Sequence, residues 1–559
     1  MTRNALLTTT FLCAGLTLGA RAADAQARVT DERVQELIRA AADRIGATGG
    51  ASTATPTQAQ ADARPQLSLS LEDAVKLALE RNLDIAVQRL NPSTFDYSIS
   101  NLSAGYRPTL TSTLSRQSTT NPSTQTISGA AAGTGIENLV NTYNGGIAQN
   151  IRWGGGSVAL TLNNNKQSTT SLTALFNPAY NTNWSAQYTQ PLLRNFKIDN
   201  TRQQLVITKL NQDISETQLQ ATIINTVSNV RNAYWDLVFG VQSVEVARRS
   251  VDLADQLVRD NQTRVEIGTM APIDVVQAQS QAATQRQNLA QAEGTRRTNE
   301  LALKRLLVAG TSDPNWNATL VPTDRPEFVP QSVDLQAVVR RALENRTDLQ
   351  IAKKNLTVND VTMKFLVNQT LPQADLVARY GLVGQGGVQY ITSGSGINRV
   401  VTGEIPGGYT DALSSLFNRN YPTWSVQLNV SYPIGTSAQE ASAARARVQV
   451  SQVAAQVKQL ELQVATDVTN AATNVQNNVE RVQAAQAARA FAERTLEAEQ
   501  SKFEVGMSTN YFVVQVQRDL ATAQNNELQA VLAYRKSLVE LERLQQTSLS
   551  SSNITILGR

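Results

Sequence analysis

Residues 71–91 read LEDAVKLALERNLDIAVQRLN, and residues 335–355 read LQAVVRRALENRTDLQIAKKN. These stretches belong to a longer match between 71–108 and 335–372, where ten of 38 positions are identical without a gap. The offset between the two copies is constant, 335 minus 71 or 264. A match of this length within one chain predicts two copies of one structural unit.

A second internal match lies between 264–279 (RVEIGTMAPIDVVQAQ) and 502–517 (KFEVGMSTNYFVVQVQ). Six of the 16 positions are identical at an offset of 238, and Gly268 corresponds to Gly506. Because the offset is smaller here than at the first match, the first copy must contain the longer insertion between the two matches.

Two segments are long enough to form helices far beyond globular length. The stretch 201–265 contains no proline and only one glycine, Gly240, and its 65 residues predict a rod of about 100 Å. The chain then turns and returns through 268–307. A second pair of segments, 437–505 and 506–544, has the same character and is rich in alanine and glutamine, so we expect two closely packed helical hairpins.

Strand-like regions precede each predicted hairpin. In TWSVQLNVSYP, residues 423–433, apolar and polar side chains alternate, which predicts a strand with one apolar and one polar face. Such a strand suits a barrel with lipid outside and water inside, and a half-buried sheet of a soluble protein shows the same alternation. The strand candidates are Pro108–Arg116, Ile151–Asn164, Trp184–Gln190, Gln373–Gly381 and Trp424–Tyr432.

The segments between these strands, 121–146 and 384–420, are rich in Gly, Ser, Asn and Thr, and we predict long loops for both. Pro191 and Pro433 follow the last strand of each copy. Proline lacks a backbone donor, so these two positions are the predicted junctions between strand and helix.

The N-terminus has the composition of a secretory signal peptide. A positive Arg3 precedes an apolar stretch and a series of small residues, which predicts a leader over 1–27 with cleavage after Ala22 or after Ala27. Either cleavage removes Cys13, the only cysteine of the chain.

The composition argues against an enzyme. The chain has no histidine, and without Cys13 it has no thiol, so the commonest general base, thiol nucleophile and transition-metal ligands are missing. We therefore expect no catalytic residues, no cofactor and no metal site. The formal charge of +4 over 559 residues is small and scattered, which disfavours nucleic acid as a partner.

Beyond the leader no run of about 18 apolar residues exists that could cross a bilayer as a helix. A membrane-spanning part would therefore consist of strands closed into a barrel. Four core strands per chain are too few for closure, so several chains would have to contribute.

Taken together, these features resemble the TolC-like outer-membrane efflux family, the outer membrane factors, over residues 67–546. The order and spacing of the motifs carry the resemblance. They are the helix starts at Ala78 and Ala342, the cluster Ala233–Leu237 (AYWDL), the strand ends Gln190–Leu192 (QPL) and Tyr432–Ile434 (YPI), and the two tip glycines.

The resemblance implies an α+β membrane protein, a homotrimer with a 12-stranded β-barrel to which each chain gives four strands. The barrel is continued by a periplasmic α-helical barrel of coiled-coil hairpins. The implied function is the outer-membrane channel subunit of a tripartite efflux or type I secretion system, a passive gated duct embedded in outer-membrane lipid. The implied partners are a periplasmic membrane-fusion adaptor protein and an inner-membrane pump or exporter.

The resemblance also implies sites. Residues 265–270 and 503–508, around the tip glycines, resemble the adaptor-docking motif, although a tight helix-to-helix turn alone also favours glycine. The candidate docking residues are Val265, Gly268, Thr269, Val505, Gly506 and Met507. The candidate periplasmic gate residues are Asp274, Phe512 and Gln515. Phenylalanine and glutamine stand where several family members have carboxylates, and Phe512 either lines the pore or packs against a neighbouring helix.

The predicted organisation is a leader (1–27), an N-terminal extension and linker (28–66), a first repeat (67–310), an inter-repeat linker (311–331), a second repeat (332–546) and a tail (547–559). The alternative function is a periplasmic coiled-coil structural or adaptor protein without a pore. A detergent-requiring trimer in the membrane fraction would favour the channel, and a soluble monomer the alternative.

Overall fold

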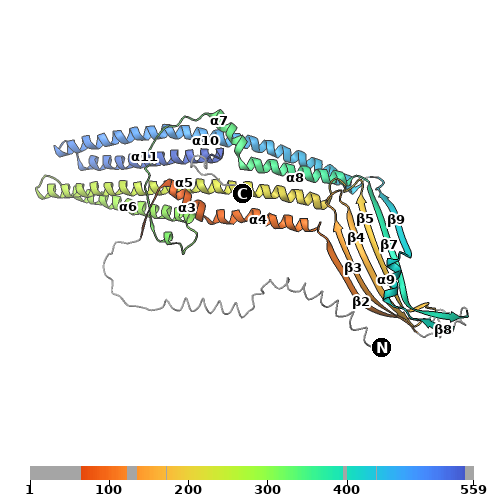
Figure 1. The fold of residues 1–559 in the computed structure, drawn as a ribbon. Coiled ribbons are helices and arrows are strands. Elements are labelled where there is room, and N and C mark those ends of the chain that lie inside the picture. Colours follow the sequence, from red (N-terminus) through yellow and green to blue (C-terminus); the bar gives the residue numbers. More distant parts are fainter. Residues whose placement is uncertain are drawn as a thin grey trace, which may run out of the picture. The chain divides into compact units, whose positions relative to one another are not determined.

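The computed structural model describes residues 65–122, 135–171, 173–325, 327–394, 400–435 and 437–547. The predicted leader and nearly all of the predicted N-terminal extension lie outside the described residues, as does the tail beyond residue 547. The described chain is an α+β protein in which long helices continue into one antiparallel sheet (Figure 1).

The helices form two sets of equal build. The first set is α3 (Leu71–Arg81), α4 (Leu83–Ala104), α5 (Asn200–Glu266) and α6 (Pro272–Leu307), and the second is α7 (Leu335–Asn345), α8 (Thr347–Gln369), α10 (Ala438–Glu504) and α11 (Asn510–Gln545). Helices α5 and α10 each have 67 residues, and α6 and α11 each have 36. The prediction of two very long helical hairpins is confirmed.

Side-chain caps fix where the long helices begin. The Asp199 carboxylate accepts a hydrogen bond from the Arg202 backbone N–H at 2.7 Å, at the start of α5. At the start of α10, Ser437 and Glu440 form a reciprocal capping box, with the Glu440 N–H 3.1 Å from Ser437 Oγ. Both caps satisfy N–H groups that have no partner within the helix.

Each helical hairpin has its own apolar core, with a buried tyrosine that bonds to a crossing segment. The Tyr234 hydroxyl on α5 lies 3.0 Å from the carbonyl oxygen of Leu69, the last residue of β1 (Gln66–Leu69). Strand β1 pairs in parallel with β6 (Thr319–Pro322), which follows the short 3-10 helix η2 (Pro314–Trp316) in the chain. The Tyr534 hydroxyl on α11 donates to the Val329 carbonyl at 2.6 Å. The Tyr234 hydroxyl also bonds to Asp324 Oδ2 at 2.7 Å, so the segment between the two sets of helices, which contains Asp324 and Val329, contacts the buried tyrosine of each hairpin.

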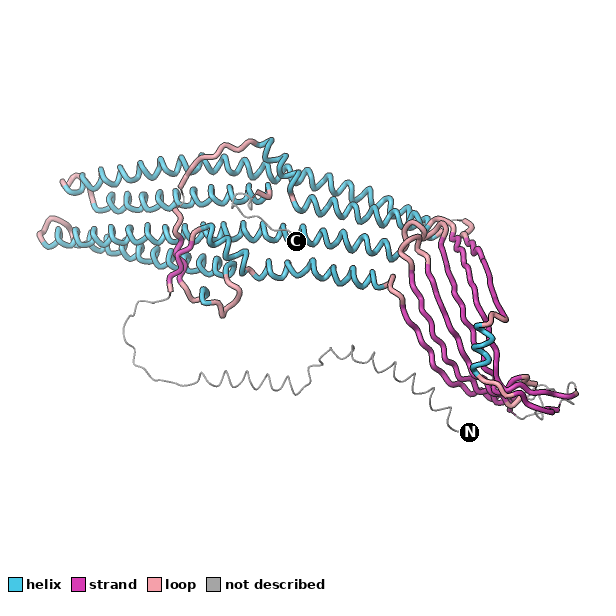
Figure 2. Tube along the Cα trace, in the orientation of Figure 1, coloured by secondary structure: helices cyan, strands magenta, loops and turns pink. Residues whose placement is uncertain are grey.

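The main sheet contains seven strands. They are β2 (Thr109–Pro122), β3 (Gly135–Asn150), β4 (Ser157–Thr169), β5 (Phe176–Pro191), β7 (Gln373–Ser393), β8 (Val400–Ile405) and β9 (Tyr421–Ser431). Their order is β2-β3-β4-β5-β7, after which β9 and β8 pair with successive parts of β7, and every pairing is antiparallel (Figure 2).

The two predicted loops and the strand count of this sheet are wrong, and one predicted strand is correct only in part. The predicted loop 121–146 contains most of β3, and the predicted loop 384–420 contains the end of β7, β8 and the helix α9 (Tyr409–Phe417). The predicted strand 151–164 is correct for 157–164, which lie in β4, whereas 151–156 form a turn. The expected four strands per chain are therefore too few. Strand β3 (GIENLVNTYNGGIAQN) was missed because it is rich in Gly and Asn, yet pairing with β2 and β4 holds it extended.

The sheet has one apolar and one polar face. Directly paired residues share a face, so the register of the strands assigns each row of side chains to one side. One row is Leu110, Ile147, Leu160, Ala186, Tyr380 and Trp424. The next row, on the opposite face, is Thr111, Gly146, Thr161, Ser185, Gly381 and Thr423.

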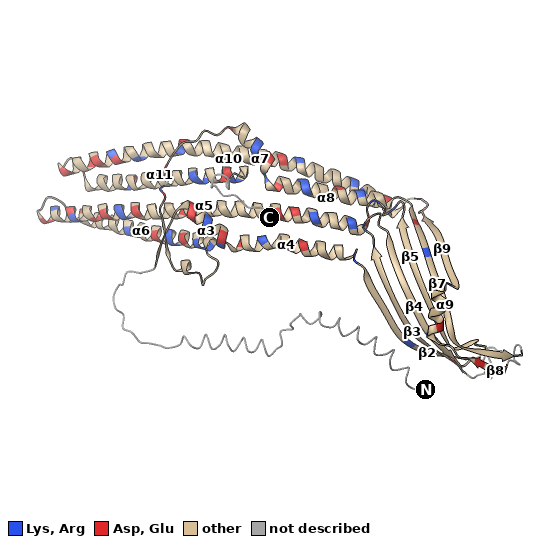
Figure 3. Ribbon diagram, in the orientation of Figure 1, with Lys and Arg blue, Asp and Glu red and all other residues tan. Residues whose placement is uncertain are grey.

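The apolar face is open to the surroundings. On β9 the side chains of Trp424, Val426, Leu428 and Val430 are between 59 and 76% exposed. Charged residues are spread along the helices and are sparse on the strands (Figure 3). Among the described helices, none combines the length and the apolar character that crossing a membrane requires.

Candidate functional site

The first helical tip joins α5 to α6 through a left-handed turn at Gly268. Its φ is +81°, the Gly268 N–H donates to the Val265 carbonyl at 3.0 Å, and the Thr269 N–H donates to the Arg264 carbonyl at 2.9 Å. These two bonds define a Schellman motif, which closes a helix by pairing its last carbonyls. A Cβ on Gly268 would have no atom within 4 Å, so the backbone conformation alone requires the glycine.

The second tip, between α10 and α11, repeats this geometry. Gly506 has φ +78°, its N–H donates to the Phe503 carbonyl at 3.2 Å, and the Met507 N–H donates to the Lys502 carbonyl at 2.8 Å. Space around a Gly506 Cβ is also open. Val505 and Met507 are 71 and 79% exposed, so the second tip presents apolar side chains to the surroundings.

The two tips contact each other. Phe503 of α10 is buried with Leu257 of α5 and Val513 of α11. The Arg264 guanidinium lies 4.4 Å from the centre of the Phe503 ring, and its Nη1 donates to the Phe503 carbonyl at 3.3 Å. The first hairpin is therefore held to the second at their ends, and the apolar part of this contact comes mostly from the second hairpin.

A pair of buried amides lies beside this cluster. Asn261 and Asn510 are 0 and 3% exposed, and Asn261 Nδ2 donates to Asn510 Oδ1 at 2.8 Å. Asn510 Nδ2 in turn donates to the Asp274 carbonyl at 3.2 Å, which links α5, α6 and α11. Sequence reasoning missed both asparagines, because neither the motif around the glycines nor the periodicity of the helices marks them.

The three predicted gate residues lie near the tips, Asp274 on α6 and Phe512 and Gln515 on α11. Phe512 is 53% exposed on the first turn of α11, with its ring 5.6 Å from that of Tyr511, so within the chain it is not a core residue. Gln515 is exposed and its Nε2 donates to Asp519 Oδ1 at 3.2 Å. Asp274 is half-buried in the first turn of α6. Any ring made of these side chains would require further copies of the chain.

The second tip also carries a local charge cluster. Glu499 accepts a hydrogen bond from the Ser508 hydroxyl and lies 3.1 Å from the Lys502 ammonium. The Ser508 bond first, and then Lys502, lower the pKa of Glu499 below its ordinary value. The Glu499 carboxylate therefore binds Ser508, in the turn between α10 and α11, to α10.

At the strand-to-helix junctions, Pro191 ends β5 and Pro433 follows β9 by two residues. After Pro191, the Leu192 N–H donates to the Ala374 carbonyl at 2.8 Å, and the Asn195 N–H donates to Asn368 Oδ1 at 2.8 Å. The first junction is therefore bonded to the end of α8 and the start of β7, which belong to the other set of elements.

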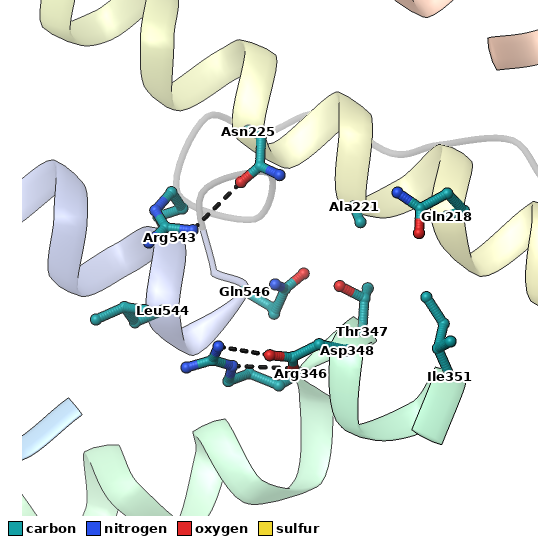
Figure 4. A pocket seen from close by; sticks show the side chains of 10 residues that line it. All are labelled: Gln218, Ala221, Asn225, Arg346, Thr347, Asp348, Ile351, Arg543, Leu544 and Gln546. Atoms are coloured by element: carbon teal, nitrogen blue, oxygen red, sulfur yellow. Dashed lines mark hydrogen bonds and ion pairs between the residues drawn. The ribbon is translucent and has the colours of Figure 1, made fainter. Parts of the chain in front are cut away.

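A cavity of about 210 Å³ lies between α5, α8 and α11 (Figure 4). Arg346 binds Asp348 at 3.0 and 2.6 Å, and Arg543 binds Glu540 at 2.8 and 2.7 Å while its Nη1 lies 3.3 Å from Asn225. Each guanidinium is neutralised by a carboxylate, so the cavity offers no unbalanced charge to a ligand. Its side chains instead connect the two sets of helices.

A comparison with known protein families finds one that matches both halves of the chain. The family model described as "Outer membrane efflux protein" matches residues 156–309 and 338–545, which are 154 and 208 of the 559 residues. The chain belongs to the outer membrane efflux protein family. Comparison with curated protein sequences gives no significant match.

Solved structures share the fold. The CmeC outer membrane channel of Campylobacter jejuni is similar with a TM-score of 0.58 at 14% identity, covering 86% of each chain. The outer membrane protein VceC of Vibrio cholerae gives 0.58 at 14% identity, covering 85% of this chain and 96% of VceC. The open state of the MtrE channel of Neisseria gonorrhoeae gives 0.56 at 15% identity, covering 85% and 88%.

Proposed function

We propose that this protein is the outer-membrane channel subunit of a tripartite efflux or type I secretion system. Three copies form a passive, gated duct that carries substrates from an inner-membrane transporter to the exterior. The observation that carries the proposal is the exposed apolar face of the sheet, backed by a polar face and continued by two helical hairpins. An apolar face toward lipid and a polar face toward water is the arrangement of a membrane barrel.

The organisation into two repeats, 67–310 and 332–546, is part of this proposal. Equal helix lengths support it, and so does the spacing of Leu71 and Leu335, the first residues of α3 and α7, which equals the offset of the sequence match. The predicted leader supports export from the cytoplasm. The proposed location is therefore the outer membrane, with the helical part in the periplasm.

The tips are the proposed docking surface for a periplasmic adaptor protein. Val265, Gly268 and Thr269 on one tip, and Val505, Gly506 and Met507 on the other, lie on or beside two turns of the same backbone geometry. Exposed apolar side chains next to a rigid turn suit a helical partner that packs end to end. Asp274, Phe512 and Gln515 are the proposed gate, and contact with the adaptor opens it by separating the hairpins.

Single-channel conductance of the purified protein in a planar bilayer tests the pore and the gate. Wild type should show discrete small openings. Phe512→Ala should raise the conductance, and Asp274→Ala should change its ion preference. Phe491→Ala is the matched control, because Phe491 is a 73% exposed phenylalanine on α10, outside the proposed gate.

The outcomes separate the pore from the gate. If trimers insert and conduct but Phe512→Ala behaves as Phe491→Ala does, the pore stands and the gate assignment fails. If no variant conducts and the protein remains soluble without detergent, the channel is refuted and the coiled-coil adaptor without a pore replaces it.

A further inference from the structure

The strands β3 and β4 are inner strands of the main sheet. Strand β3 pairs with β2 over Gly135–Ala148 and with β4 over Asn138–Asn150, and β4 pairs with β5 over Ser157–Gln167. The apolar and polar rows described above run through both strands without interruption. Both strands therefore have a hydrogen-bonded neighbour on each side, as the inner strands of a barrel do. Six of the described strands, β2, β3, β4, β5, β7 and β9, are longer than ten residues.

The turn between β3 and β4 is bonded to the junction where β5 becomes α5. Gln190 Nε2 donates to the Gly154 carbonyl at 2.8 Å, and the Trp153 and Phe196 rings lie 6.1 Å apart. Gly155 has φ +68°, and a Cβ there would lie 2.7 Å from the Asn195 carbonyl oxygen, so the turn closely approaches the junction. The β3–β4 hairpin is thus fixed at the helical end of the sheet.

The width that six strands of one chain cover matches the width covered by the four helices connected to them. At the sheet, the helices follow the order α4, α5, α8 and α10, each in contact with the next. At about 9 Å between neighbouring axes, four helices cover about 36 Å. Six strands about 4.8 Å apart and tilted by about 40° cover about 38 Å of circumference, whereas four would cover about 25 Å.

The two edges of the sheet are open. Within the described residues, β2 pairs only with β3, and β9 pairs only with β7. Leu110 on β2 and Trp424 on β9 lie at opposite ends of one apolar row and are 80 and 76% exposed. The outer backbone N–H and C=O groups of an edge strand are free to pair with another strand. The apolar face of the sheet extends to both of these edges. The occupant that satisfies both edges at once is a second copy of this chain.

We propose that β9 of one copy pairs with β2 of the next, and that the trimer of the proposed function, on which this count rests, closes a barrel of 18 strands. Such a barrel has about one and a half times the circumference of one with 12 strands at equal tilt. The duct is then as wide in the membrane as in the helical tube. The tips, not the membrane segment, set the size limit for what passes.

A single-particle electron-microscopy map of the full protein in detergent or lipid nanodiscs tests the proposal. The expected result is three-fold symmetry with 18 strands in cross-section. Three-fold symmetry with 12 strands and the β3–β4 hairpin outside the wall overturns the inference and leaves the proposed function intact. A copy number other than three overturns both.

Disulfide cross-linking checks the strand order in solution, starting from a Cys13→Ser chain that has no other cysteine. Thr161→Cys with Ser185→Cys joins β4 to β5, where the two native hydroxyl oxygens are 2.7 Å apart. Thr113→Cys with Asn144→Cys joins β2 to β3, because these residues are directly paired. Both pairs should oxidise nearly completely.

The matched control is Thr113→Cys with Ser185→Cys, whose strands are separated by β3 and β4. It should not form an intrachain disulfide, because the two positions are separated by three strand spacings of about 4.8 Å each and by two residues along the strands. Efficient linkage of this control pair, together with loss of the β2–β3 disulfide, would show that β2 pairs with β5 and would refute the 18-stranded barrel.

Discussion

The two helical tips share a backbone and differ in their side chains. Gly268 and Gly506 have φ values of +81 and +78°, and both close a Schellman motif with the same pattern of hydrogen bonds. At the offset of 238 that relates the tips, Asn261 of the first tip corresponds to Glu499 of the second. The half-buried Val265 of the first tip likewise corresponds to the buried Phe503 of the second. The turn is thus set by glycine and by hydrogen bonds that almost any sequence can make, whereas the contact between the hairpins depends on residues that differ.

The difference assigns separate tasks to the tips. The second hairpin supplies Phe503 and Val513 to the apolar contact, to which the first adds Leu257. The first supplies Arg264 to the polar contact, and the amide pair takes one residue from each hairpin. Under the proposed function, separation of the tips requires breaking this unequal contact. The variants below, from the largest expected effect to the smallest, test how unequal it is.

Replacing Phe503 with alanine should have the largest effect. The substitution leaves a cavity between Leu257 and Val513 and removes the ring under Arg264, so the tip contact should weaken by about 3 kcal/mol. Val265→Ala, the equivalent change in the first tip, should cost about 1 kcal/mol because Val265 is only half-buried. Hydrogen exchange of amides in 255–266 measures both, and equal effects would contradict the unequal contact.

Replacing either buried asparagine should weaken the contact by about 1–3 kcal/mol, since the change breaks the bond from Asn261 Nδ2 to Asn510 Oδ1 and leaves the remaining one of these two atoms buried without a partner. The double variant should cost less than the sum of the two, because the second substitution removes the atom that the first one left without a partner. A double-mutant cycle on the same hydrogen-exchange signal gives the coupling energy, and strict additivity would show that the bond between the two amides contributes nothing.

Gly268→Ala and Gly506→Ala should destabilise their turns by a similar amount, about 1–2 kcal/mol each, because both force an L residue into a left-handed conformation in open space. Gly294→Ala is the control, since Gly294 lies within α6 with nothing near its Cβ, and there alanine should stabilise the helix by about 0.5–1 kcal/mol. Thermal unfolding and local hydrogen exchange report all three, and a cost at only one tip would disprove the shared geometry.

Acidification should loosen the second tip only. The pKa of Glu499 is lowered in the folded protein, so its stabilising contribution is present above the unfolded pKa of about 4.3 and is lost as the pH falls through the lower folded value. The first tip has the uncharged Asn261 at the equivalent position. Amide exchange at both tips from pH 6 to 3 should show a selective change that Glu499→Gln abolishes. A change of equal size at Gly268 would disprove the assignment.

The long helices were predictable because their signals are local. The absence of proline and the presence of a single glycine predicted α5, and its apolar residues at spacings of three and four, Val227, Val230, Tyr234 and Leu237, are all buried. The tip glycines were found for the same reason, since a left-handed turn between helices favours one residue type. The four-strand count failed because β3 carries too few apolar residues to be recognised without its neighbours.

The sequence by itself determined the doubled organisation of helices, the turn at each tip, the alternation of β9 and the absence of histidine. These follow from backbone preferences and periodicity, which act over a few residues. Only the tertiary structure decided that Asn261 meets Asn510, that Arg264 covers Phe503 and that six long strands share one sheet. Those contacts join residues far apart in the chain, and their energies depend on burial and pairing that local patterns do not encode.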